Sequence, residues 1–450
     1  MRAGVTLLKH GMAEAAIEPL RNAARLRPID LRTHEYLARA LLESGRGGDA
    51  FAIYEHILRL RPRHGEAQLG RGRALQAMGD VDRALDTFRA ASMDSPKAWL
   101  AWNAIADITP DEDERIDAIA RAADTLLNAC RRPNRSPEVV AACADALIDA
   151  RRHDEAVRFI HDNFDRFQRS WIAESKAATA HYQSGAFWKA FTQMDNALAA
   201  FGQEDLAQAA PDGSASTSRA QDALRSVIEI LGRCGVRAFL VAGTLLGFVR
   251  HGALLAHDHD GDIGVIRGQD GSPDIAAIIR EAPDLVLERR ARPGDRYFKV
   301  IHQGAAIDIF LHDHTNDHII SGLSDHPGDL QWLVPRFDIV EAPLGAQTWR
   351  VPYPTETYLE KFFGPAWKSR DARLVSDIAS PALVEASIHA RGYHSAARAL
   401  ESLRAGDRVR ARALLRRSPL PLRADATRLA ELHLPGPRER AGSDDETPGV

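Results

Sequence analysis

The segment AGTLLGFVRHGALLAHDHDGDIGVI (242–266) concentrates residues that can do chemistry. Asp258, Asp260 and Asp262 alternate along it. In an extended segment, residues two apart point to the same face, so the three carboxylates can line one side of a strand. Like charges this close raise one another's proton affinity, and a divalent cation removes that conflict. Oxygen ligands at this density favour Mg²⁺ or Mn²⁺.

A further carboxylate, Asp308, lies in AAIDIFLHD (305–313), where apolar residues flank it on both sides. A charge inside so apolar a strand is costly unless it is paired or bound to a metal. If this strand lies beside the first one, Asp308 completes a carboxylate metal site. We therefore predict metal binding by Asp258, Asp260, Asp262 and Asp308. A calcium site or a solvated loop remains the alternative for alternating aspartates.

The residues just before the acids can bind phosphate. VRAFLVAG (236–243) is expected to form a buried strand, and Gly243 and Thr244 then supply a tight turn. Backbone N–H groups in such a turn, together with the Thr hydroxyl, can hold a phosphate near the start of a helix.

The first half of the chain repeats with a step of 34 residues. Apolar residues at three- to four-residue spacing predict pairs of helices, with a glycine at the turn and a proline that closes each unit. The pattern resembles the tetratricopeptide repeat, which implies a curved groove for a peptide or protein. We expect about five hairpins, with the chain beginning almost inside a second helix. The alternative is that the array only packs against the rest of this chain. The clearest series are Gly11, Gly45 and Gly79; Pro28, Pro62 and Pro96; and Ala16, Ala50 and Ala84.

Three blocks of the second half carry a closer resemblance. They are GTLLGFVRHGALLAHDHDGDIGV, IDIFLHD, and VPYPTETYLEKFFGPAW (351–367). Their order, with Gly-Thr, then Asp-x-Asp, then a later Asp, resembles the nucleotidyltransferase superfamily related to DNA polymerase beta. More closely, they resemble the LicD family, which includes fukutin and fukutin-related protein. The likeness covers residues 219–372. His257 stands where the family has a Trp before the acids, and Gly261 stands where the family has a small apolar residue between the last two acids. The Asp positions are intact.

The resemblance implies an enzyme that transfers a phospho-alcohol, such as phosphocholine or ribitol phosphate, from a CDP-linked donor to a hydroxyl of a glycan or glycolipid. It implies a place in cell-surface polysaccharide biosynthesis, a divalent cation at the acids, and catalytic roles for Asp260, Asp262 and Asp308. Arg250 matches the family's Arg and would neutralise a donor phosphate, or would instead pair with one of the aspartates. Lys299, in RYFKV, is a further candidate for phosphate contact. Two alternatives stay open: a non-catalytic repeat scaffold that binds nucleotide, and a nucleotidyltransferase that uses an NTP.

We therefore expect a multidomain chain. It starts with an all-α tetratricopeptide-type solenoid (1–202), in which the repeats bind a protein partner. A linker (203–218) leads to a LicD-like, nucleotidyltransferase-fold domain with an α/β mixed sheet (219–378). A C-terminal helical hairpin (379–433) and a disordered tail (434–450) follow.

Composition excludes several other classes. The formal net charge of the 450 residues is −4, so no general basic excess points to nucleic acid. The 3 cysteines are too few for a disulfide framework, which favours a reducing compartment. The longest near-continuous apolar stretch runs from Ala238 to Val249, whereas a membrane-spanning helix needs roughly 20 residues. We expect a cytoplasmic protein without a transmembrane segment, with peripheral membrane association left open.

Overall fold

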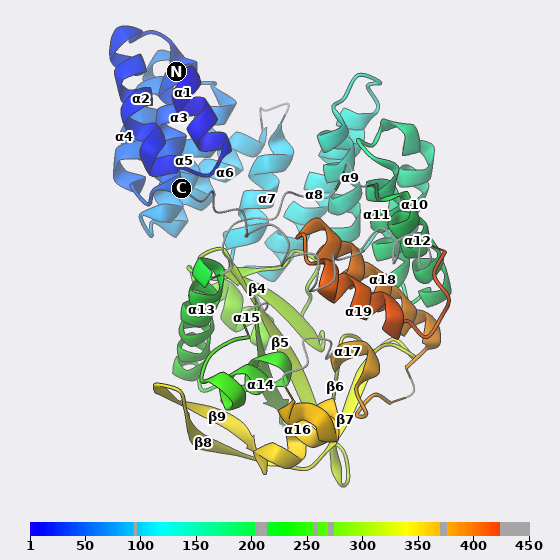
Figure 1. Ribbon diagram of the computed structural model, residues 1–450. Coiled ribbons are helices and arrows are strands. Elements are labelled where there is room, and N and C mark those ends of the chain that lie inside the picture. Colours follow the sequence, from blue (N-terminus) through cyan, green and yellow to red (C-terminus); the bar gives the residue numbers. More distant parts are fainter. Residues whose placement is uncertain are drawn as a thin grey trace, which may run out of the picture.

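The computed structural model describes residues 1–93, 97–202, 205, 214–255, 260–268, 274–369, 376–384 and 386–423. Antiparallel helix pairs, stacked side by side, form its first part (Figure 1). No helix within these ranges is both long and apolar enough to cross a lipid bilayer. In chain order the helices of the solenoid are α1 (Arg2–Lys9), α2 (Ala13–Leu26), α3 (Leu31–Glu43), α4 (Gly47–Leu60), α5 (Gly65–Ala77), α6 (Val81–Met93), α7 (Ala98–Ile108), α8 (Glu112–Cys130), α9 (Pro137–Asp149), α10 (His153–Asp162), α11 (Ser170–Gln183) and α12 (Phe187–Ala200).

The 34-residue series explain how each pair folds. Gly11, Gly45 and Gly79 all have φ between +73° and +81°, a backbone conformation that glycine adopts without strain. Arg151 takes the equivalent turn position in a later pair with φ 56°. The alanines at the small position are fully buried, which lets neighbouring helices approach closely. The all-α solenoid is thus confirmed.

The number of hairpins differs from the prediction. The helices α1 to α12 make six pairs rather than five, because α1 is a short first helix and not the beginning of a second one. Its eight residues give too few apolar positions for a helical period to stand out.

A seven-stranded mixed sheet forms the centre of the second part, as predicted. Its strand order is β1-β2-β5-β4-β3, and β6 pairs with both β5 and β7. The pair β2–β5 is parallel and the other pairs are antiparallel. A separate hairpin lies below the sheet in Figure 1. The strands are β1 (Phe239–Leu240), β2 (Asp260–Arg267), β3 (Val286–Leu287), β4 (Tyr297–His302), β5 (Ala305–His314), β6 (His318–Gly322) and β7 (Gln331–Pro335), with β8 (Asp338–Leu344) and β9 (Gln347–Tyr353) in the hairpin.

Helices cover the sheet, and α13 lies against β2 and β5. This contact is close at Gly261, where an added Cβ would stand 3.0 Å from both Leu224 Cδ1 and Ile307 Cδ1. The glycine that departs from the family pattern therefore makes room for α13. The helices of this part are α13 (Ser214–Arg233), α14 (Ala242–His251), α15 (Ile275–Glu281), α16 (Thr355–Phe363) and α17 (Ser376–Ala379).

The strand predicted over residues 236–243 is wrong in extent. β1 has two residues, and the chain enters α14 at Ala242, so Gly243 and Thr244 lie in the first turn of a helix. An unbroken apolar run fits a buried strand and a buried helix equally well, so its period does not show where one becomes the other.

The C-terminal helices α18 (Ile388–Arg404) and α19 (Arg408–Arg417) form the expected hairpin. In Figure 1 they lie between the last repeats and the sheet. Tyr393 stacks on Tyr182 of α11 with ring centroids 4.5 Å apart, and both side chains are buried. The hairpin thus extends the helical array. The predicted tail (434–450) and most of the predicted linker lie outside the described residues, and α13 already begins at Ser214.

Candidate functional site

Charged side chains form a row across three neighbouring strands on one face of the sheet. Asp262 of β2 is the register partner of Asp308 on the parallel strand β5. Lys299 of β4 is the antiparallel partner of Asp308 from the other side. Asp260 precedes Asp262 by two residues and so points to the same face. We call Asp260, Asp262, Asp308 and Lys299 the charged row. The two distant acidic segments are therefore brought together.

Asp308 is more deeply buried than Lys299, its partner in the charged row. Its side chain is 13% exposed, and its Oδ1 is buried without a hydrogen-bond partner in the part of the chain that the structure describes. Burial raises its pKa to about 6; Lys299 opposes this rise, whereas the negative charge of Asp260 adds to it. A hydrogen bond with the Tyr297 hydroxyl favours the ionised form. A desolvated carboxylate oxygen without a donor is an unfavourable state that a bound cation would relieve.

Lys299 makes an ion pair, and its side chain is partly exposed. Its Nζ lies 3.6 Å from Oδ1 of Asp308. Burial disfavours the charged ammonium, but the carboxylates of Asp308, Glu288 and Asp260 together raise its pKa. The side chain therefore balances the negative charge of the row. Phosphate binding by Lys299 stays a prediction.

The first turn of α14 holds β2 in place at Asp262. The Oγ1 atom of Thr244 accepts a hydrogen bond of 2.7 Å from the backbone N–H of Asp262, and Val241 N–H donates to the Asp262 carbonyl at 3.3 Å. Ala242, between them, has φ +44°, a strained conformation for a residue with a side chain. Thr244 is buried, so its hydroxyl serves first to position the strand. The predicted contact of Gly243 and Thr244 with phosphate stays a prediction.

Arg250 lies at the other end of α14, about 9 Å along the helix axis from Thr244. Its Nε and Nη2 atoms are buried and have no hydrogen-bond partner among the described residues. Burial lowers the pKa of this guanidinium. Orphaned N–H groups on a cation fit an anionic ligand, since a phosphate offers the acceptors that the guanidinium lacks.

The charged row offers donor atoms for a metal ion. Asp260, Asp262 and Asp308 supply carboxylate oxygens, the ligands that Mg²⁺ and Mn²⁺ prefer, and the orphaned Oδ1 of Asp308 fits a cation. The described side chains do not form a ready cluster of three or more ligands around one point. The predicted ligand Asp258 lies in the segment 256–259, outside the described residues. The carboxylate oxygens of the charged row are therefore donor atoms of the kind that a divalent cation binds.

Three residues beside the charged row escaped the sequence analysis. Tyr297 hydrogen-bonds to Asp308, and burial, followed by the charge of Asp308, raises its pKa well above the usual range. Glu288 donates its backbone N–H to the carbonyl of Lys299 and forms a 3.0 Å ion pair with Arg290. The period of two along β4 could have indicated Tyr297. Glu288 and Arg290 lie in a loop, where no such period exists.

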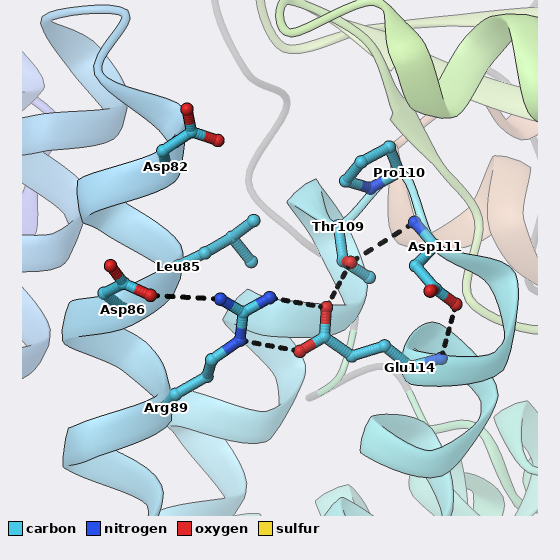
Figure 2. A pocket seen from close by; sticks show the side chains of 8 residues that line it. All are labelled: Asp82, Leu85, Asp86, Arg89, Thr109, Pro110, Asp111 and Glu114. Atoms are coloured by element: carbon cyan, nitrogen blue, oxygen red, sulfur yellow. Dashed lines mark hydrogen bonds and ion pairs between the residues drawn. The ribbon is translucent and has the colours of Figure 1, made fainter.

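The structure also has a hollow of about 700 Å³, but it lies on the solenoid and away from the charged row. Figure 2 shows its lining, from one face of α6 and the start of α8. Arg89 donates to both carboxylate oxygens of Glu114 at 2.7 and 3.0 Å, and to Asp86 at 3.1 Å. Arg89 is the single cation of this lining, against four carboxylates, and it is held by two of them. The hollow contains no residue of the charged row, and we do not assign the chemistry to it.

Comparisons with known families agree with the two-part architecture. Residues 235–327 match the family model described as LicD/FKTN/FKRP, nucleotidyltransferase domain. Residues 41–108 match a tetratricopeptide repeat model, and residues 2–63 match a model described as a bacterial transcriptional activator domain. The LicD match includes the whole charged row. The closing aromatic block (351–367) lies beyond it.

Curated relatives match the same part of the chain. Ribitol-5-phosphate transferase FKTN of Mus musculus is 28% identical over 174 residues, and the Homo sapiens protein is 25% identical over the same length. The match covers 38% of this chain and 37% of each relative. Among solved structures, a tetratricopeptide repeat protein from Thermus thermophilus aligns with 44% of this chain and 88% of its own, at 18% identity and a TM-score of 0.28. The family models thus find a tetratricopeptide repeat match in residues 41–108 and a LicD match in residues 235–327 of the same chain.

Proposed function

We propose that this protein transfers a phospho-alcohol, such as ribitol phosphate or phosphocholine, from a CDP-linked donor to a hydroxyl of a glycan or glycolipid. The observation that carries the proposal is the charged row, in which Asp308 stands beside Asp260, Asp262 and Lys299 on one face of the sheet. The likeness to ribitol-5-phosphate transferases supports the reaction class.

The reaction is a substitution at phosphorus. The acceptor hydroxyl oxygen attacks the distal phosphorus of the donor, a new P–O bond forms, and the bond to the bridging oxygen breaks. CMP leaves with the electron pair of that bond. Asp308, whose pKa of about 6 allows it to be ionised at neutral pH, takes the proton of the acceptor hydroxyl. Arg250, with its orphaned N–H groups, binds a donor phosphate.

A divalent cation, Mg²⁺ or Mn²⁺, would be held by Asp260, Asp262 and Asp308, with Asp258 as a further ligand. When bound, it would neutralise charge on the donor diphosphate and on the leaving nucleotide. Thr244 holds the backbone of Asp262 and so keeps the second carboxylate in register with Asp308.

The repeats have a separate part in the proposal, which is to bind a protein partner. In Figure 1 the first helices, α1 to α5, extend away from the sheet, whereas later repeats lie against it. The later repeats thus serve the packing within this chain, and the first ones remain available to a partner.

The test uses the full chain with CDP-ribitol, CDP-glycerol and CDP-choline, each with Mg²⁺ or Mn²⁺ and with a glycan acceptor. We expect divalent-dependent release of CMP with at least one donor. Asp260→Asn should lower the rate by about 10²-fold or more, because a buried group that acts on transition-state charge contributes on this scale. The matched control is Asp338→Asn, at an exposed aspartate of the β8–β9 hairpin, which should keep the wild-type rate.

Other products would favour the alternatives. Release of pyrophosphate from CTP, with no cleavage of CDP donors, would favour an NTP-using nucleotidyltransferase. Metal-dependent binding of CDP without turnover, and normal glycan decoration in cells that carry Asp260→Asn, would favour the scaffold.

A further inference from the structure

A fully buried arginine joins the repeats to the loop before β4. Arg115 of α8 has a side-chain exposure of 0%. Its Nη2 donates to the carbonyls of Glu288 at 2.8 Å and Arg289 at 3.0 Å, and its Nη1 donates to the carbonyl of Ala291 at 2.9 Å. A guanidinium removed from water needs acceptors for its donors. Three carbonyls of one loop accept from the two Nη atoms, Glu112 pairs with Nη1 at 3.3 Å, and Nε has no hydrogen-bond partner among the described residues. The planar fork therefore holds the backbone of this loop in one shape.

The loop leads directly to the charged row. The N–H of Glu288, whose carbonyl accepts from Arg115, donates to the carbonyl of Lys299 at 3.0 Å. The amine of Lys299 then lies 3.6 Å from Asp308 Oδ1. Three successive contacts thus connect a helix of the repeats to the carboxylate of the candidate site.

Other residues of the repeats hold the same loop (288–295). The side chains and carbonyls involved come from the ends of α7 and α9, next to α8, so the loop is held at several points along its length. These contacts are Arg289 with Asp107 (2.7 Å, two hydrogen bonds), Arg151 Nε with the Arg290 carbonyl (3.0 Å), Arg151 Nη2 with Asp295 (2.5 Å) and Arg292 Nη2 with the Asp149 carbonyl (3.1 Å).

We propose that Arg115 is a positioning residue of the candidate active site. Through the loop 288–295 it sets the position of Lys299, and through Lys299 that of Asp308. The solenoid is then an integral part of the catalytic unit and not a separable recruiting arm. The effect of Arg115 on turnover rests on the proposed function, whereas its effect on the structure of the loop 288–295 does not.

The experiment compares Arg115→Met with Arg121→Met in the full chain. Arg121 lies on the same helix and is 55% exposed. It pairs with Asp117 of its own helix and lies over the Trp102 ring of α7, so its replacement is a control that removes an arginine from α8 without removing any of the hydrogen bonds that Arg115 makes to the loop 288–295. Amide hydrogen exchange is followed across the chain, and kcat and KM are measured for cleavage of CDP-ribitol. For Arg115→Met we expect exchange in residues 286–302 to rise at least about tenfold while α1–α6 keep their protection. We expect kcat to fall at least about tenfold with KM nearly unchanged.

Other outcomes would count against the positioning role of Arg115 or against the proposed function. If exchange and kcat match those of Arg121→Met, or if exchange rises evenly over the whole chain, Arg115 has no positioning role and the proposal is overturned. If the wild-type protein cleaves no CDP donor, the proposed function fails, and local exchange alone decides the role of Arg115. Should Arg115→Met not fold, Arg115→Lys replaces it, because an ammonium keeps the charge but lacks the fork that joins three carbonyls. Hydrogen exchange and kcat of Arg115→Lys are then interpreted in the same way.

Discussion

The amine of Lys299 stands 3.6 Å from Oδ1 of Asp308, on neighbouring antiparallel strands, with Asp260 and Asp262 beside them. Of the cations that act on Asp308, this amine has the largest effect, and Arg398 of α18 adds to it. A bound divalent cation would take over the same electrostatic role. Lys299 and a metal are thus alternative partners for one carboxylate, and this relationship can be measured.

Replacing Lys299 by Met should therefore make the protein depend on metal. Without metal, Asp308 is left beside other acids, and we expect a loss of unfolding free energy of about 1–3 kcal/mol, below the usual value for a broken buried pair because Lys299 is 33% exposed. Mg²⁺ or Mn²⁺ should raise Tm more in Lys299→Met than in the wild type. Thermal unfolding with EDTA and with each metal measures this. Lys361→Met, at an exposed lysine of α16, is the control. Equal metal shifts in all three proteins would argue against a metal at the charged row.

Gly261→Ala should disturb the site through packing. The added methyl group would stand 3.0 Å from Leu224 and from Ile307, so α13 or β2 has to move, and we expect a loss of about 1–3 kcal/mol. The movement would displace the acids on either side of residue 261. Gly232→Ala is the matched control, because nothing lies within 4 Å of its added Cβ, and it should be neutral or stabilising. Urea unfolding and the rate of CMP release test both variants. Wild-type stability and rate in Gly261→Ala would refute this prediction.

Asp149 should make stability depend on pH. Burial, with the charge of Asp145 adding and Arg289 opposing, raises the pKa of its carboxyl from 3.8 to about 6. A carboxyl whose folded-state pKa is raised favours the folded state when it is protonated. Its contribution is therefore full below pH 4 and is lost as pH rises through about 6.

Asp149→Asn should remove this dependence. At pH 8 we expect the variant to be more stable than the wild type by about 2–3 kcal/mol, and the difference should vanish near pH 4. Asp162→Asn, at an aspartate that is 73% exposed on α10, is the control. Denaturant unfolding at several pH values measures the difference. A constant offset between Asp149→Asn and the wild type from pH 4 to 8 would contradict the assignment.

A buried polar network should bind the last repeat to the sheet domain. Asp329 accepts hydrogen bonds from the hydroxyls of Tyr182 and Ser324 and from the N–H of Leu330, and His394 of α18 lies 2.9 Å from the Tyr182 oxygen. Asp329→Ala leaves these donors without an acceptor, and we expect a loss of about 2–4 kcal/mol.

A double-mutant cycle tests the network. Once Asp329 is replaced by Ala, the further change Tyr182→Phe should cost little, since its partner is already gone. Asp338→Ala should change the unfolding free energy by less than about 0.5 kcal/mol, because its side chain is exposed. Additive losses in the cycle would show that Tyr182 and Asp329 act independently.

The sequence by itself determined the parts of this protein that depend on local spacing. The 34-residue step identified the helix pairs, and their turns occur at Gly11, Gly45 and Gly79 as expected, since a positive φ is a local demand on one residue. The period of two along the segments of β2 and β5 placed Asp260, Asp262 and Asp308 on strand faces. The end of the first strand was misjudged, because an apolar run carries no period that separates strand from helix.

Only the tertiary structure decided what these elements face. It paired Lys299 with Asp308 and placed Tyr297 beside them. It also placed the Thr244 hydroxyl where it accepts a hydrogen bond from the backbone N–H of Asp262. It also brought Arg115 to carbonyls more than 170 positions away in the sequence. Every residue has the same backbone carbonyl, so residue type does not indicate which carbonyls a distant arginine will bind. Such contacts arise only when sheet and solenoid pack together and exclude water from between them.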